Sequence, residues 1–135
     1  MQNKSIESIL TAISLLQKQT PLKVDSFFNP PLLSNEQCLQ NPKLASIVYI
    51  LKQYPVKRAA LFGSVARNEM SETSDIDMLV EFHPGASGLD FYGLGGDLED
   101  ALKCHVDLLT WASLRDAKRD FAQNVINDAR LIYES

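Results

Sequence analysis

Apolar residues recur at helical spacing near the start of this chain. Residues 4–19 carry their apolar side chains on one stripe, which consists of Ile6, Ile9, Leu10, Ile13 and Leu16. This spacing predicts an amphipathic helix, with Asn3 as its cap and Pro21 at its end. Residues 20–33 lack such a period, and Pro30-Pro31 excludes a helix there.

Two shorter helices are expected before residue 55. Residues 34–40 begin with the pattern of a capping box, which predicts one helical turn or two. Asn41-Pro42 opens the next helix, because proline is favoured at the first helical position. Its apolar face consists of Leu44, Ile47, Val48 and Leu51. These segments together predict a helical N-terminal extension over residues 1–54.

Strand-like and helix-like segments alternate in the rest of the chain, which is the pattern of an α/β protein. The segments with strand character are residues 56–62, 75–82 and 105–110, and those with helical character are 89–103 and 113–130. The final helix is expected to use Ser113 as its cap and to bury Leu114, Ala117, Phe121, Val125 and Ala129. Residues 55–135 are therefore expected to form one α/β domain.

Charge and composition narrow the classes of function. The chain has 135 residues and a formal net charge of −4, so a broad basic face for extended nucleic-acid binding is not expected. Cys38 and Cys104 form no CxxC pair, which disfavours a zinc site. The sequence contains neither an apolar run long enough to span a membrane nor a signal peptide, so a cytoplasmic location is expected.

The acidic residues of the 75–82 segment suggest a metal site. Side chains alternate across a strand, so Asp75 and Asp77 share one face with Leu79 and Glu81. Two carboxylates so close together repel unless a cation lies between them, and hard oxygen ligands favour Mg²⁺ or Mn²⁺. Solvated acids at the start of a strand are the alternative. Glu81 lies further along and is expected to form a surface contact or a salt bridge.

Three further features complete the candidate site. Asp107 is an acid within an apolar strand, and it would join Asp75 and Asp77 if the two strands are neighbours; an acid on an edge strand is the alternative. Gly63-Ser64 follows a strand, where glycine permits a sharp turn and the next amides can bind phosphate. Arg67 either contacts phosphate or pairs with a nearby acid.

Two other groups of residues are given structural interpretations. Gly93, Gly95 and Gly96 do not form a phosphate loop because no Lys-Ser/Thr follows them, so irregularity of the helix or close packing is expected. His105 is interpreted as a hydrogen-bonded strand residue instead of a metal ligand.

The stretch LFGSVARNEMSETSDIDMLVEF resembles the signature of the polymerase-β-like nucleotidyltransferases, and most closely their minimal MNT-type members. The resemblance covers roughly residues 56–133 and implies a small mixed sheet flanked by helices. It implies that Gly63 and Ser64 hold a triphosphate. It also implies that Asp75, Asp77 and Asp107 bind Mg²⁺, with Asp107 acting as the general base. Val65 and Asn68 differ from the arginine and glycine that the family often has there.

The resemblance also implies a function. MNT proteins are often antitoxins that transfer AMP from ATP to a tyrosine of a helical HEPN ribonuclease toxin, so a protein adenylyltransferase with such a partner is expected. Two alternatives remain open. One is an antitoxin with a weak or inactive site that neutralises its toxin by binding alone, and the other is a nucleotidyltransferase that modifies a small molecule such as an antibiotic.

Overall fold

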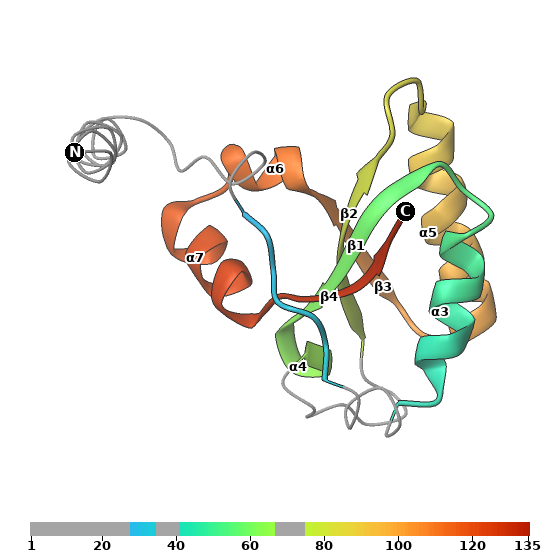
Figure 1. Cartoon of the computed structure of the whole chain (residues 1–135), viewed down its shortest axis with the longest axis horizontal. Helices are drawn as coiled ribbons and strands as arrows, with labels where there is room; N and C mark the ends of the chain where they lie inside the picture. Colours follow the sequence, from blue (N-terminus) through green and yellow to red (C-terminus); the bar gives the residue numbers. More distant parts are fainter. Residues whose placement is uncertain (1–27, 35–40, 67–74) are drawn as a thin grey trace, which may run out of the picture.

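A computed structural model describes residues 28–34, 41–66 and 75–135 of the chain (Figure 1). A four-stranded mixed sheet is the centre of this structure, with the strand order β3-β2-β1-β4. The strands are β1 (Val56–Phe62), β2 (Ile76–Phe82), β3 (Val106–Thr110) and β4 (Arg130–Glu134). β1 pairs antiparallel with β2 and with β4, whereas β2 and β3 are parallel. The small mixed sheet expected for this fold is confirmed.

Helices cover both faces of the sheet (Figure 1). One face packs against α3 (Lys43–Leu51) and α5 (Gly88–Leu102), and the other against α6 (Trp111–Arg115) and α7 (Arg119–Asp128). The short α4 (Gly63–Ala66) follows β1 directly. The alternation predicted for β2 is confirmed, because Ile76, Met78 and Val80 lie in the α3–α5 core while Leu79 lies in the α6–α7 core.

The single helix predicted over residues 113–130 is wrong. The chain forms α6, then α7, and ends in β4, which pairs with β1. Thr110 caps α6, because its hydroxyl accepts from the Ser113 amide at 3.1 Å, so Ser113 is not the cap. The break lets α6 pack on β2 and β3 while α7 packs on β1, which one straight helix cannot do across a twisted sheet.

The burial along α7 differs from the prediction accordingly. Phe121 was expected on the buried face but is 45% exposed, and Ala122 is fully buried beside Val125. The extended backbone of Lys118 separates α7 from α6, so the helical phase starts anew at Arg119. No glycine or proline marks this break in the sequence.

The segment before residue 54 contributes to the same core. Leu44, Ile47 and Leu51 of α3 are buried against the sheet, as their spacing predicted. Residues 28–34 form no helix and run beside β4, where the Leu33 amide donates to the Leu131 carbonyl at 2.9 Å. The helix expected at residues 4–19 lies outside the described residues, as do residues 35–40 of the helix expected at 34–40. The boundary at residue 54 stays a prediction.

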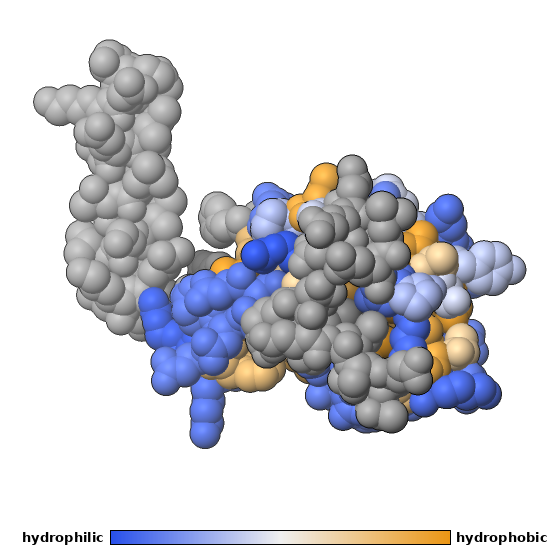
Figure 2. Space-filling view, turned by 90° about the horizontal axis from the view of Figure 1, so that it is seen from below, coloured by the Kyte–Doolittle hydropathy of each residue, from blue (hydrophilic) through white to orange (hydrophobic). Residues whose placement is uncertain are grey.

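The surface of the molecule is mixed in character. Figure 2 shows hydrophilic and apolar residues side by side at the end of the molecule where α3 and α5 lie. The large exposed apolar side chains there are Tyr49 on α3 and Leu89 and Tyr92 on α5. Within the part of the chain that the structure describes, no helix has the length and hydrophobicity needed to cross a membrane.

Candidate nucleotidyl-transfer site

Gly63 turns the chain sharply where β1 ends. Its φ angle is +71°, which side chains with a Cβ rarely adopt. A Cβ built at Gly63 would collide with Oδ2 of Asp77 on the neighbouring strand. The glycine is therefore needed twice, for its backbone conformation and for the space that the Asp77 carboxylate occupies.

Gly63, Asp77 and Asp107 lie in a row across three adjacent strands. Phe62, which precedes Gly63, is the register partner of Asp77, and Asp77 is the register partner of Asp107. Neighbouring strands are about 4.8 Å apart, and register partners in a parallel pair point to the same face. The pairing of β2 with β3, on which the predicted role of Asp107 depended, is thus present.

Asp75 lies two residues before Asp77 and outside this row. It immediately precedes β2 and is exposed, and the amide of the next residue, Ile76, donates to the His105 carbonyl at 3.0 Å. Across the described ranges no group of three or more His, Cys, Asp or Glu side chains is close enough to hold a metal ion. The convergence of Asp75 with Asp77 and Asp107 therefore stays a prediction.

Glu99 of α5 fixes the beginning of β3. Its carboxylate accepts from the Val106 amide at 2.9 Å, and the same oxygen, Oε2, lies 2.9 Å from Nδ1 of His105. The other ring nitrogen of His105, Nε2, lies 3.7 Å from Oδ1 of Asp107. His105 immediately precedes β3 and does not lie within it. Its side chain lies between two acids, Glu99 and Asp107.

Two other residues of the predicted site are less fully described. Ser64 lies in α4, directly after the Gly63 turn, but its side chain is outside the description. Arg67 lies outside the described residues. Their predicted contacts with phosphate stay predictions.

The donors in the row suit a magnesium ion chemically. Asp77 and Asp107 offer carboxylate oxygens from one face of adjacent strands, and the Asp107 side chain is 65% exposed. Mg²⁺ prefers such hard oxygen ligands and is usually bound by one or two carboxylates together with water and substrate phosphates. The space left by the missing Cβ of Gly63 keeps Asp77 close to the turn after β1.

Comparison with known proteins agrees with this geometry. The family described as "Polymerase beta, Nucleotidyltransferase" matches residues 45–135. This chain belongs to that nucleotidyltransferase family. The match includes every described residue of the row and also most of α3, which begins at Lys43.

Relatives within the nucleotidyltransferase family support the assignment. MJ0435 of Methanocaldococcus jannaschii, named as a protein adenylyltransferase, is 48% identical over 83 residues, which are 62% of this chain and 86% of that protein. A solved minimal nucleotidyltransferase is 29% identical with a TM-score of 0.53, covering 69% of this chain and 92% of its own.

A third similarity is to a solved complex of a tri-AMPylated Shewanella oneidensis HEPN toxin with an MNT antitoxin. A chain of that complex is 24% identical to this one and has a TM-score of 0.50. The alignment covers 73% of each chain. At this identity the likeness concerns the fold.

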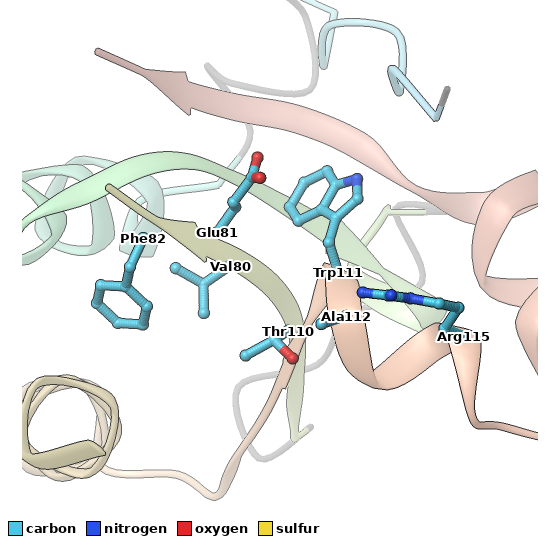
Figure 3. Close-up of a pocket in the computed structure, with 7 residues that line it drawn as sticks. All are labelled: Val80, Glu81, Phe82, Thr110, Trp111, Ala112 and Arg115. Carbon is cyan, nitrogen blue, oxygen red and sulfur yellow. The ribbon is translucent and has the colours of Figure 1, made fainter. Parts of the chain in front are cut away.

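A pocket of about 340 Å³ lies at the opposite end of β2 from Asp77 (Figure 3). Glu81 and Trp111 point to the same side of β2 there, and Phe82 points to the other. Nε of Arg58 donates to Glu81 at 2.6 Å, and the guanidinium lies 4.1 Å from the centre of the Trp111 ring. The salt-bridge role expected for Glu81 is confirmed.

Arg58 was not singled out in the sequence, although it is a buried cation in a central strand. Its Nη1 donates to the Phe28 carbonyl at 3.0 Å and to the Asn29 side chain at 2.9 Å. The Trp111 indole donates to the same carbonyl at 3.3 Å. These bonds attach residues 28 and 29 to the sheet, and an arginine inside the otherwise apolar segment 56–62 was the available signal.

A groove that no sequence pattern indicated lies between α5 and the edge strand β3. The groove has a volume of about 390 Å³, and its lining includes Tyr92, Gly96 and Asp107. α5 is an unbroken helix through its three inner glycines, so the expected irregularity is wrong. Close packing is confirmed only for Gly93, where an added Cβ would lie 3.1 Å from the Tyr54 hydroxyl oxygen.

Proposed function

We propose that this protein is a Mg²⁺-dependent nucleotidyltransferase that uses ATP and adds AMP to a tyrosine of a partner HEPN ribonuclease toxin. The observation that supports this most directly is the row of Gly63, Asp77 and Asp107 across adjacent strands. Family membership supports nucleotidyl transfer. The name of the relative MJ0435 supports a protein as the acceptor.

The chemistry assigned to the row is a displacement at the α-phosphorus of ATP. The phenolic oxygen of tyrosine bonds to this phosphorus while the bond to the β-phosphate side breaks, and pyrophosphate leaves with the bonding electrons. The phenolic proton passes to the Asp107 carboxylate, which acts as general base. Bound Mg²⁺ supplies positive charge that stabilises the transferring phosphate.

The proposal assigns a role to each residue of the site. The turn at Gly63 opens α4, whose first amides would donate to the triphosphate. Asp77 and Asp75 would hold the metal, and Asp107 would contribute an oxygen ligand as well as the base. The exposure of Asp107 on the edge strand leaves it accessible to an acceptor from outside the protein.

The choice of acceptor follows from a structural neighbour. In the similar Shewanella oneidensis complex the MNT antitoxin is bound to a HEPN toxin that carries AMP groups. We extend this arrangement to the present chain, so a stable complex with a helical toxin and neutralisation of its ribonuclease activity are expected.

The test is transfer of label from ATP to a protein partner. The protein is purified with its partner from the native host and incubated with Mg²⁺ and ATP labelled at the α-phosphate. The intact mass of the partner is expected to increase by the mass of the added AMP. Asp107→Asn is expected to slow the transfer by about 10²–10⁴-fold, the usual contribution of a general base.

The same preparation separates the alternatives. If wild-type protein and Asp77→Asn neutralise the partner equally well, and the mass of the partner does not increase, neutralisation occurs by binding alone. Label that appears on an added aminoglycoside but never on the partner would show a small-molecule enzyme. Either result contradicts the proposal.

A further inference from the structure

We infer that the outer edge of β3 holds an extended segment of the partner protein by backbone pairing, and that this segment carries an apolar residue followed two positions later by a basic one. The inference rests on the proposed function for the existence of a protein partner, and it adds how that partner is held. β3 is the last strand of the sheet, and no strand among residues 28–34, 41–66 and 75–135 pairs with its outer side.

The backbone groups of β3 alternate between its two sides. The Ile76 amide of β2 donates to the His105 carbonyl at 3.0 Å, so the backbone of His105 faces β2. Successive residues of a strand present their amides and carbonyls to opposite sides. The backbone groups of Val106, Leu108 and Thr110 therefore point outward, away from β2.

Side chains close both ends of this outer edge. The Glu99 carboxylate accepts from the Val106 amide at 2.9 Å. The Ser113 hydroxyl accepts from the Thr110 amide at 3.2 Å and donates to the Thr110 carbonyl at 2.8 Å. Leu108 lies between these two positions, and within the described part of the chain its outward amide and carbonyl have no hydrogen-bond partner. The centre of the edge is thus open.

An extended segment can pair with this open centre. Addition of a strand to an exposed sheet edge is a recurrent mode of peptide binding. In an antiparallel pair, which is slightly more stable per residue than a parallel one, one residue exchanges both backbone bonds with the residue opposite. The segment residue opposite Leu108 would accept from the Leu108 amide and donate to its carbonyl. The residue two positions later would donate to the outward carbonyl of Val106.

The groove of about 390 Å³ between α5 and β3 suits the side chain of the segment residue opposite Leu108. Cross-strand partners share a face of the sheet, and Leu108 packs against the α3–α5 core. A Cβ built at Gly95 would lie 3.9 Å from Cδ2 of Leu108, so the backbone of α5 is close to this residue. At Gly96 a built Cβ meets no atom within 4 Å, which leaves room for an apolar side chain beside Tyr92.

The groove is separate from the carboxylates of the row. Asp77 and Asp107 alternate with Met78 and Leu108, which pack into the α3–α5 core, so the two carboxylates face the α6–α7 side of the sheet. A side chain in the groove consequently takes no part in the chemistry. Changes in the groove are expected to alter the affinity for the partner and not the affinity for ATP.

Charge indicates which molecule pairs with this edge. α5 carries no basic residue and four acids, which are Asp90, Asp97, Glu99 and Asp100. Antiparallel pairing of β3 with a second copy of this chain would place both α5 helices on one face of the joined sheet, where like charges repel. A lysine or arginine opposite Val106 would instead lie on the α5 side, where Glu99 lines the groove. A basic segment is therefore favoured, most strongly at low ionic strength.

Three synthetic peptides test the backbone pairing with the full-length protein. Each contains the order Val-Leu-Thr-Arg between terminal threonines; one is unmodified, one has N-methylleucine and one has N-methylthreonine after the leucine. The leucine amide is the group that donates to the Leu108 carbonyl, whereas the following threonine amide points away from β3. Fluorescence anisotropy is expected to show about 10-fold weaker binding for the N-methylleucine peptide and a change of less than about 2-fold for the other.

Gly96→Leu tests the groove, because the leucine side chain fills it. The variant is expected to raise the Kd for the unmodified peptide by about 10-fold, while the Kd for ATP with Mg²⁺ changes by less than about 2-fold. Gly88→Leu is the matched control, since Gly88 begins the same helix, has open space around it and does not line the groove. A peptide with glutamate in place of arginine is expected to bind more weakly, by a factor that shrinks at high salt.

Amide hydrogen exchange reports on the edge directly. The Leu108 amide is expected to exchange more slowly when the unmodified peptide is bound. The exchange of the Thr110 amide is expected to stay the same, because Ser113 already accepts from it.

The outcomes are distinguishable from a failure of the proposed function. Peptide binding that protects Leu108, without transfer of AMP to any protein, contradicts the proposed function alone. Equal binding of the two N-methyl peptides, or unchanged exchange at Leu108, overturns the docking edge even if transfer to the partner occurs. Protection of Leu108 that increases with protein concentration in the absence of peptide also overturns it, because a second copy would then occupy the edge.

Discussion

The carboxylate of Asp77 occupies the space where Gly63 would have a Cβ. The two residues are 14 positions apart in sequence but meet because β1 and β2 pair in antiparallel register, with Phe62 opposite Asp77. Any side chain at residue 63 must therefore move the acid on which the proposed metal site depends. The contact links the turn after β1 to the chemistry of β2.

Gly63→Ala is expected to lower both stability and activity. Alanine at a φ of +71° is strained, and its Cβ displaces Asp77, so we expect a loss of about 1–3 kcal/mol in the free energy of unfolding. Transfer of AMP is expected to fall below detection. Urea denaturation and the labelled-ATP assay measure the two effects.

Gly85→Ala is the matched control for Gly63. Gly85 has a φ of +98°, but a Cβ there meets no atom within 4 Å. It therefore adds strain without a collision, and we expect a loss of stability with normal transfer. Equal activity of both variants would contradict the role given to the Gly63–Asp77 contact.

Removal of one carboxylate is expected to abolish the stabilisation that Mg²⁺ and ATP confer. Ligands that bind only the folded state stabilise it by about 2.7 kcal/mol at 100 times their Kd. Wild-type protein should show a corresponding rise in Tm with Mg²⁺ and ATP, and chelation of the metal with EDTA should reverse it.

Asp77→Asn is expected to lose this rise in Tm while keeping the Tm of the ligand-free protein. Asp100→Asn is the control, because Asp100 is an exposed acid on α5 that lies outside the row. If Asp77→Asn gained as much stability from Mg²⁺ and ATP as wild type does, Asp77 would not be a metal ligand.

Arg58→Met is expected to destabilise the protein by about 3 kcal/mol, at the lower end of the range for breaking a buried ion pair. The change leaves Glu81, whose side chain is 29% exposed, without its partner, and it removes the bonds to Phe28 and Asn29. Lys57→Met, at the exposed neighbouring position, should change stability by less than about 0.5 kcal/mol. Chemical denaturation compares the two.

A double variant shows whether the loss comes from the unpaired acid. Arg58→Met with Glu81→Leu replaces both charges by apolar groups, which is often neutral or better. We expect it to recover part of the stability lost in Arg58→Met. If no stability is recovered, the loss in Arg58→Met comes from the broken hydrogen bonds to residues 28 and 29.

Tyr54 is expected to make stability depend on pH in alkaline solution. Its hydroxyl donates to the Asp97 carboxylate, and this bond, with partial burial and the negative charges of Asp97 and Asp90, raises the pKa of Tyr54 from 10.0 to about 12. The folded state thus favours the neutral phenol. The resulting stabilisation is complete below pH 10 and is lost as the pH rises through 12.

Tyr54→Phe removes this contribution. Below pH 10 it should cost about 1 kcal/mol, the usual net value of one hydrogen bond, and the difference from wild type should shrink between pH 10 and 12. Tyr49→Phe serves as the control, since Tyr49 is 68% exposed on α3. A difference between Tyr54→Phe and wild type that stays constant up to pH 12 would contradict the assignment.

Local patterns predicted most of the elements near the site. The strands at residues 56–62 and 75–82 agree with β1 and β2 to within one residue, because a period of two and a following Gly-Ser turn are properties of the chain itself. The two-residue spacing of Asp75 and Asp77 predicted a shared side of the strand for the same reason, and Asp75 immediately precedes β2. The helix at 89–103 differs from α5 by one residue at each end.

Other features depend on which segments meet. β4 overlaps the predicted helix only at Arg130, and its pairing with β1 makes residues 130–134 a strand. The burial of Arg58 depends on Trp111, Phe28 and Glu81, which surround it only in the folded chain. The groove beside Tyr92 and Gly96 exists because α5 packs beside an edge strand.

The sequence by itself determined the family signature, the alternation that places acids on one face, and the glycine turn, because each depends on neighbours within a few residues. The tertiary structure decided the order β3-β2-β1-β4, which brings Asp107 opposite Asp77 and places Asp107 at the rim of the sheet. Strand order results from long-range burial and pairing, which no local spacing encodes.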